Sequence, residues 1–339
     1  MPSAPQSSMC RRTLRFALRA IPVFACLIAG FLITCSRGRE PDPGAQKSWA
    51  YIMSGMLDTS ADAAYLESAA SRYDVICLTG YYLNARGDLV TSEANVALLK
   101  RISGAKSICP LVTFSSAADG TAMLKSETAR ENAVARLAAL LEKHRLQGIH
   151  FDFEYIPPEH AKRLAEFLAL ARAKLSSEGA VRLSMAIFPP VDFPEKWAKF
   201  HDLSLIGKHL DEIVLMCYDL NRADTSPGPV TSLQWAERNI DRVARVFPSA
   251  RTWLGIPAYG YAWPPRGRAQ VIAARDAAAE SSRYSGKRDS SGTITYSYQG
   301  PAGTHRVYFS DAETRRLLAV LAQKKGLAGT ALWRLGLED

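Results

Sequence analysis

Two carboxylates two positions apart stand in a short apolar run of the chain. Residues 146–158 read LQGIHFDFEYIPP. If the run forms a strand, its side chains alternate between two faces, so that His150, Asp152 and Glu154 share one face. Carboxyl groups at this spacing raise the pKa of one of them, which then keeps its proton near neutral pH. A protonated Glu154 suits a general acid for a glycosidic leaving group. The alternative is an edge strand with solvated acids.

Eight apolar, strand-like runs alternate with helical stretches from residue 48 onward. Most of the runs are continuously apolar, as is typical of parallel strands covered on both faces. Eight βα units in about 290 residues predict an α/β fold of the (β/α)8 TIM barrel type, with a doubly wound open sheet as the competitor. The predicted strands are 49–56, 75–82, 107–114, 148–155, 182–188, 212–218, 252–259 and 329–335.

Helical patterns occupy 127–144, 158–177 and 311–325. An unusually long segment, 262–328, separates the last two strands and contains two alternating runs around the turn GPAG at 300–303. We predict a small α+β insertion there, at about 264–309, between strand seven and the last helix. In barrels of this type the carboxyl ends of the strands carry the catalytic groups, which is where Glu154 lies.

The first 35 residues are typical of an export signal. Basic residues up to Arg19 precede an apolar run at 20–34 that is too short for a comfortable membrane span. The run ends at Thr34 and Cys35, which resemble a bacterial lipobox, although Thr34 is larger than the usual Gly, Ala or Ser. We predict a signal at 1–35, lipidation at Cys35, a tether at 36–47 and the barrel at 48–339. The expected location is an exported, membrane-anchored lipoprotein, periplasmic or at the cell surface, and otherwise a secreted protein.

Composition excludes several other classes of function. The formal net charge is +9, and four arginines of the first twenty residues contribute to it. No basic run with interleaved aromatics indicates nucleic-acid binding, and no nucleotide-binding loop or other motif implies a cofactor. The three cysteines after the leader are Cys77, Cys109 and Cys217. Their spacing argues against disulfides and against a zinc site, so we expect buried small side chains and no metal.

Four segments, in order along 48–339, resemble motifs of glycoside hydrolase family 18, the chitinase-like enzymes. Residues 147–154 are similar to the fourth-strand motif D-G-x-D-x-D-x-E, with Gln147 and His150 in place of the first two acids. The other three segments are LMCYD at 215–219, LGIPAYG at 254–260 and LWRLG at 332–336. The branch that this chain resembles most includes bacterial spore-germination and cell-wall hydrolases.

The resemblance implies a retaining mechanism without a carboxylate nucleophile, in which the N-acetyl oxygen of the substrate attacks the anomeric carbon. It implies that Glu154 protonates the leaving oxygen and later activates water. It implies that Asp152 holds the acetamido N–H and stabilises the oxazolinium intermediate. Tyr218 and Asp219 would grip the acetamido group and the sugar, and Trp333 would form the floor beneath the ring. Trp333 as ordinary core and Tyr218 as a barrel cap stay open as alternatives.

Met216, Tyr51 and Tyr259 are further candidate substrate contacts. Barrel packing is the alternative for Met216, and bracing of the insertion is the alternative for Tyr259; Tyr51 is expected in the barrel interior near Asp152. His150 replaces an acid that, in the family, lies beneath the following Asp. An imidazole can hydrogen-bond a carboxylate and, as a cation, lower its pKa. We therefore expect His150 to orient Asp152 and to alter the pH profile without abolishing turnover.

The sequence thus predicts an exported glycosidase that cleaves a β-linked, N-acetylglucosamine-containing glycan, peptidoglycan or chitin-like, by substrate-assisted retaining hydrolysis. Its partners would be that glycan and, through the lipid anchor, the membrane; we expect a monomer that binds no nucleic acid. A non-catalytic, lectin-like barrel at the cell surface is the alternative, because Gln147 and His150 depart from the motif. A surface protein for host attachment is a third.

Overall fold

The computed structural model describes residues 47–53, 60–102, 107–175 and 181–339. All of these belong to one structural unit, residues 41–339. The predicted signal, Cys35 and nearly all of the predicted tether lie outside the described residues. Within the described part of the chain, no helix combines the length and the apolar character needed to cross a membrane.

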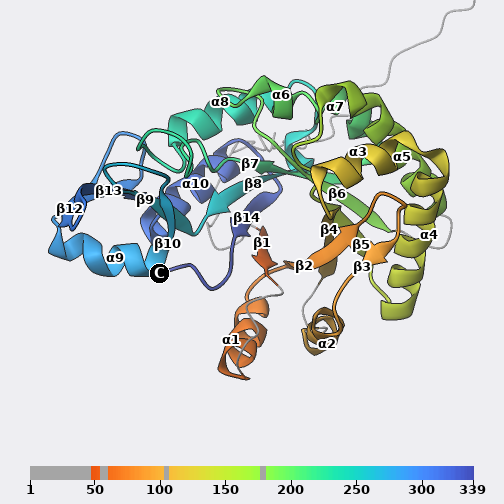
Figure 1. Cartoon of the computed structure of the whole chain (residues 1–339), viewed down its shortest axis with the longest axis horizontal. Coiled ribbons are helices and arrows are strands. Elements are labelled where there is room, and N and C mark those ends of the chain that lie inside the picture. Colours follow the sequence, from red (N-terminus) through yellow and green to blue (C-terminus); the bar gives the residue numbers. More distant parts are fainter. Residues whose placement is uncertain (1–46, 54–59, 103–106, 176–180) are drawn as a thin grey trace, which may run out of the picture. The chain divides into compact units, whose positions relative to one another are not determined.

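A ring of parallel strands forms the centre of this unit (Figure 1). Its members, in order around the ring, are β1 (Lys47–Ile52), β2 (Val75–Leu83), β4 (Ile108–Phe114), β5 (Gly148–Phe151), β6 (Arg182–Ile187), β7 (Glu212–Met216), β8 (Thr252–Pro257) and β14 (Gly329–Trp333). The ring closes because β1 pairs with β14 on one side and with β2 on the other. A short strand, β3 (Leu89–Val90), pairs antiparallel with β2. The predicted (β/α)8 barrel is confirmed, and the open sheet is excluded.

Helices follow the strands and pack on the outside of the ring. They are α1 (Ser60–Ala70), α2 (Glu93–Arg101), α3 (Ala117–Lys125), α4 (Glu127–His144), η3 (Pro158–His160), α5 (Ala161–Leu175), α6 (Glu195–Ala198), α7 (Leu203–Ile206), η4 (Gly207–His209), α8 (Leu233–Val243), η5 (Ser249–Arg251) and α10 (Ala312–Lys324). The predicted helix 127–144 is confirmed as α4. Ser126 caps its N-terminus by accepting the N–H of Ala129, and Arg145 ends it in the left-handed region. The helix predicted over 158–177 begins as η3, starting at Pro158, and continues as α5.

Alternation along the strands divides the core into two layers. Trp49 and Tyr51 of β1 face the inside of the barrel, where Trp253 meets Trp49 with ring centroids 5.5 Å apart. The neighbours Ala50 and Ile52 pack instead against the outer helices. The period of two in a strand requires this division. The predicted burial of the cysteines is also confirmed: all three are free thiols in the core.

The insertion is a second sheet that follows β8. Its elements are β9 (Tyr259–Trp263), β10 (Gln270–Ala273), α9 (Ala274–Arg283), β11 (Lys287–Arg288), β12 (Ile294–Gly300) and β13 (Gly303–Phe309), with the strand order β10-β9-β13-β12-β11. The insertion begins at Tyr259, upstream of the boundary predicted at about 264. The strand predicted over 252–259 is divided between β8 of the barrel and β9 of the insertion. The division falls at Ala258, whose N–H donates to the Trp333 carbonyl, while Tyr259 already pairs with Ala273.

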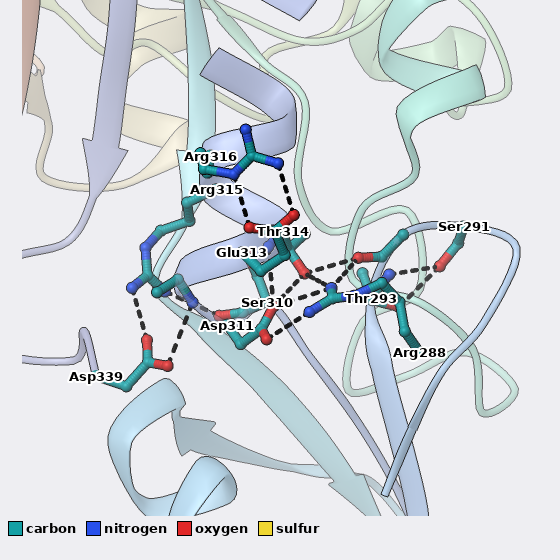
Figure 2. Close-up of polar contacts among 12 residues, drawn as sticks. Arg288, Ser291, Thr293, Ser310, Asp311, Glu313, Thr314, Arg315, Arg316 and Asp339 are labelled. Atoms are coloured by element: carbon teal, nitrogen blue, oxygen red, sulfur yellow. Dashed lines mark hydrogen bonds and ion pairs between the residues drawn. The ribbon is translucent and has the colours of Figure 1, made fainter. Parts of the chain in front are cut away.

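An ion-pair network joins the insertion to the last barrel helix (Figure 2). Asp311 caps α10 by accepting the Thr314 N–H, and its carboxylate also receives the guanidinium of Arg288 at 2.6 Å. Arg315, one turn later, pairs with Asp339 at the chain end, also at 2.6 Å. Charge-assisted, two-sided contacts of this kind are stronger than single surface pairs. The network holds β11 and the C-terminal segment against α10.

Candidate active site

The strand that carries the predicted acid is shorter than expected. The β5 ladder ends at Phe151, although the Asp152 N–H still donates to the Val112 carbonyl at 2.9 Å. This bond keeps the chain extended past the ladder, so the alternation of side chains continues through Glu154. Phe153 is buried on the outer side, and Tyr155, with φ of 58°, turns the chain away.

A pocket of about 160 Å³ opens at the carboxyl ends of the strands. Every lining residue except Ala186 is a predicted site residue, because strand ends facing the barrel interior meet at one point. A larger cavity of about 920 Å³ lies elsewhere, among η3, α5, α7 and α8, and shares none of this lining. The smaller pocket is the candidate site because it holds the paired carboxyls. Its lining is Tyr51, Asp152, Glu154, Ala186, Met216, Tyr218, Asp219 and Trp333.

Asp152 and Glu154 share a hydrogen bond inside this pocket. Burial raises the pKa of Asp152 to about 6, although the bond from Glu154 works to lower it. Burial, and then the negative charge of Asp152, hold the pKa of Glu154 well above its ordinary value. The interaction with the Tyr155 hydroxyl opposes this rise. The arrangement thus favours the proton on Glu154 over Asp152.

One carboxylate oxygen of Asp152 lacks a protein partner in the part of the chain that the structure describes. Asp152 Oδ1 is buried and has no hydrogen-bond partner among the described residues. A buried acceptor without a partner is costly, and such exceptions concentrate at functional sites. An N–H donor from a bound substrate would satisfy it.

Stacked rings form one wall of the pocket. The rings of Tyr218 and Trp333 are nearly parallel, at 18°, with centroids 6.4 Å apart. Tyr51 meets the Trp333 ring edge-on at 5.1 Å. Flat apolar faces beside a carboxyl pair suit the ring of a sugar, whose C–H groups pack against aromatic surfaces.

Comparison with known proteins agrees with this geometry. The model of the glycosyl hydrolases family 18 matches residues 66–338. The chain belongs to family 18. The cortical fragment-lytic enzyme of Bacillus subtilis (strain 168) is 25% identical over 230 residues, which cover 64% of this chain and 53% of that enzyme. This chain spans about half to two thirds of the length of the curated relatives it matches.

Solved structures share the barrel. The chitinase from Chromobacterium violaceum ATCC 12472 superposes with a TM-score of 0.79 at 25% identity, covering 87% of this chain and 96% of that one. The Bacillus cereus spore cortex-lytic enzyme SleL superposes with a TM-score of 0.78 at 19% identity, covering 86% of this chain and 71% of that one. The second likeness is one of fold alone.

His150, which departs from the family 18 motif, does not bond Asp152, so that expectation is wrong. Its Nε2 lies 2.9 Å from the Tyr51 hydroxyl and its Nδ1 lies 2.9 Å from the Ser184 hydroxyl. Both ring nitrogens are thereby occupied within the barrel. Burial also lowers the pKa of His150 to about 3, so the imidazole stays neutral at physiological pH. A neutral ring cannot lower the pKa of Asp152 through charge.

Tyr259 stands behind the pocket, not on its lining. Its hydroxyl donates to Asp219 Oδ1 at 2.5 Å, and the hydroxyl of Tyr261 donates to the same oxygen at 2.9 Å. Asp219 has φ of 60°, a left-handed conformation in which Asp is one of the tolerated residues. Burial raises its pKa, and the two hydroxyls work in the opposite direction. The sequence analysis missed Tyr261, although its spacing of two from Tyr259 along a strand was a signal for the shared face.

His201 is a second residue that the sequence analysis missed. Its Nδ1 accepts the Phe188 N–H at 2.9 Å, so the proton must reside on Nε2, which donates to the Phe153 carbonyl at 2.9 Å. The imidazole thus fixes the backbone between the two acids to the end of β6. Burial lowers its pKa to about 4, although the bond to Phe153 opposes this. No local motif marks His201, because its partners are backbone groups from distant segments.

Proposed function

We propose that this family 18 chain is a glycosidase that hydrolyses a β-linked, N-acetylglucosamine-containing glycan. The observation that carries the proposal is the pair of partly buried, contacting carboxyls that line the pocket at the carboxyl end of β5, with the pKa of both raised by burial. A carboxyl kept protonated near neutral pH can donate to a glycosidic oxygen, as general acid catalysis requires. Glu154 takes this role, and its conjugate base then activates water.

The closeness of the two carboxyls argues for help from the substrate. The two side chains contact each other directly. Retaining glycosidases with a carboxylate nucleophile separate the two groups by about 5–5.5 Å, and inverting ones by about 6.5–9.5 Å. Contacting carboxyls therefore favour a route in which the acetamido oxygen of the substrate is the nucleophile and the acetamido N–H donates to the partnerless Oδ1 of Asp152.

The remaining lining residues then have defined tasks. The ionised Asp152 balances the positive charge of the oxazolinium intermediate. Tyr218 and Asp219, on the segment after β7, hold the acetamido group and a sugar hydroxyl. Trp333 packs beneath the ring at the cleaved bond, and Met216 completes the apolar side.

Peptidoglycan is the substrate we propose first, with chitin-like glycans second. The name of the Bacillus subtilis relative, a cortical fragment-lytic enzyme, supports a wall glycan. The basic and apolar leader and the lipobox-like Cys35 support export and lipid anchoring, which would hold the barrel beside the wall. Together these features support a reaction outside the cytoplasm.

The test uses the purified full chain with N-acetylglucosamine oligomers and with peptidoglycan. We expect release of reducing ends with retained anomeric configuration, and a loss of about 100- to 10,000-fold in Glu154→Gln with binding preserved. The matched control is Glu159→Gln, an exposed glutamate of η3, which should keep full turnover. Replacing the acetamido group of the substrate by a hydroxyl should abolish turnover. Binding without turnover by the parent protein would instead establish the lectin-like alternative.

A further inference from the structure

A guanidinium lies over two aromatic rings beside the pocket. Arg222 Cζ is 5.1 Å from the ring centroid of Trp197 and 5.8 Å from that of Phe193. The Trp197 ring meets the Tyr155 ring edge-on, with centroids 5.0 Å apart. Tyr155 directly follows Glu154 in the chain, and burial and then the charge of Glu154 raise the pKa of the Tyr155 hydroxyl. Tyr155, Phe193, Trp197 and Arg222, which we call the arginine shelf, are therefore continuous with the general acid.

The arginine shelf supplies a positive charge that the pocket lacks. The lining, within the part of the chain that the structure describes, carries the carboxyls of Asp152, Glu154 and Asp219 and no basic side chain. Burial is the main cause of the raised pKa values of Asp219 and Tyr155, and the positive charge of Arg222 opposes the rise at both residues. The charge of Arg222 therefore acts on Asp219 of the pocket lining and on Tyr155, which follows Glu154. Without it, an anionic substituent on a glycan would meet only carboxylates.

The cation is held in place by its loop. The backbone N–H of Arg222 donates to Thr225 Oγ1 at 3.0 Å. The Thr225 carbonyl accepts the indole N–H of Trp263 at 2.9 Å. The loop is therefore tied to β9 of the insertion. Asp224 contacts Arg222 Nε at 2.8 Å and is about half exposed, so it occupies one edge of the guanidinium from the solvent side. A ligand carboxylate can displace this half-exposed acid or bind beside it.

We propose that Arg222 binds a carboxylate carried by the glycan next to the cleaved bond, so that the site selects acidic N-acetylated glycans over neutral ones. The inference rests on the proposed function and deepens it. The guanidinium is suited to the task because its planar fork matches a carboxylate and stacks on aromatic faces. The half-exposed ring of Tyr155 offers the adjoining sugar an apolar face. The ligand class is a glycan whose acidic sugar, or the substituent on it, presents a carboxylate.

Two substrates that differ only in charge test this. The first is a peptide-free β-1,4 glycan of alternating N-acetylglucosamine and N-acetylmuramic acid; the second is the same glycan with its carboxylates amidated. With the full chain, Arg222→Gln should lower kcat/KM on the acidic glycan about 10- to 100-fold, mainly through KM, the loss expected for a charge-assisted hydrogen bond. On the amidated glycan its effect should stay within about twofold, because the charged contact is absent.

Substitution of the neighbouring Asp224 should change kcat/KM in the opposite direction. Asp224→Asn removes the competing carboxylate and keeps the cation, so it should raise kcat/KM on the acidic glycan and leave the amidated glycan unaffected. Arg268→Gln, at an exposed arginine of the insertion, is the control and should match the parent on both. Equal losses on both glycans, or no loss in Arg222→Gln, would overturn the proposal. A parent that cleaves neither glycan nor chito-oligosaccharides would refute the proposed function instead.

Discussion

Replacement of Asp152 by Asn tests whether the two acids work as one unit. The negative charge of Asp152 raises the pKa of Glu154, second only to burial. Two unit charges roughly 4 Å apart interact by about 4 kcal/mol at an effective dielectric constant of 20. Because Asn removes this repulsion, it should lower the pKa of Glu154. Turnover should also fall 100-fold or more, because the oxazolinium ion loses its counter-charge.

The assay is the pH dependence of kcat/KM for an N-acetylglucosamine oligomer. In the parent, activity should rise with pH through about 6 as Asp152 ionises, and it should fall at higher pH as Glu154 loses its proton. Both limbs belong to the coupled pair. In Asp152→Asn the limb near 6 should vanish, and the alkaline limb should move to lower pH. Retention of the limb near 6, or an alkaline limb that does not move down, would refute the assignment of the shared proton.

Three further changes follow from the same contacts. His150→Gln should leave both limbs of the pH profile in place between pH 4 and 9, because the imidazole does not titrate there; a limb lost near 6.5 would contradict this. His201→Phe should lower kcat at least tenfold and the free energy of unfolding by about 2–4 kcal/mol, because the Phe153 carbonyl loses its buried donor; unchanged kcat in a folded variant would exclude a positioning role. Asp311→Asn should lower the urea midpoint, with a cost of about 1 kcal/mol, because the ion pair with Arg288 is lost while Asn still caps α10. Burial works to raise the pKa of Asp311, but the bonds of Asp311 with Arg288 and Thr314 lower this pKa overall. The ionised carboxylate therefore stabilises the fold above the unfolded pKa near 3.9, and this stabilisation is lost as the pH falls through the folded pKa. The difference in urea midpoint between the variant and the parent should shrink as the pH falls below about 4.

The barrel and most of the pocket lining could be predicted because they depend on local periodicity. A strand that alternates with period two places Asp152 and Glu154 together, whatever the rest of the chain does. The rule that catalytic groups lie at the carboxyl ends of barrel strands then unites segments far apart in sequence. The lining residues Tyr218 and Trp333 were found by this reasoning together with the family motifs.

Hydrogen-bond partners could not be predicted in the same way. His150 bonds Tyr51 and Ser184 because the register of three strands brings them to one level inside the barrel, and no spacing in the sequence encodes that level. The same holds for His201, whose partners are a carbonyl and an N–H of other segments. Such choices depend on tertiary geometry, so a residue's type gives the possible bonds but not the one that forms.

The single residue between β8 and β9 has a mechanical consequence. Ala258 alone separates a barrel strand from a strand of the insertion, and its N–H is held by the carbonyl of Trp333, the residue that ends β14. Rotation of the insertion against the barrel would break this bond and draw Tyr259 and Tyr261 away from Asp219. The two tyrosines that hold Asp219 are therefore fixed to the barrel before any substrate binds. Glycan chains should bind a preformed site without a slow closing step, so stopped-flow binding traces should show a single phase whose rate rises linearly with glycan concentration.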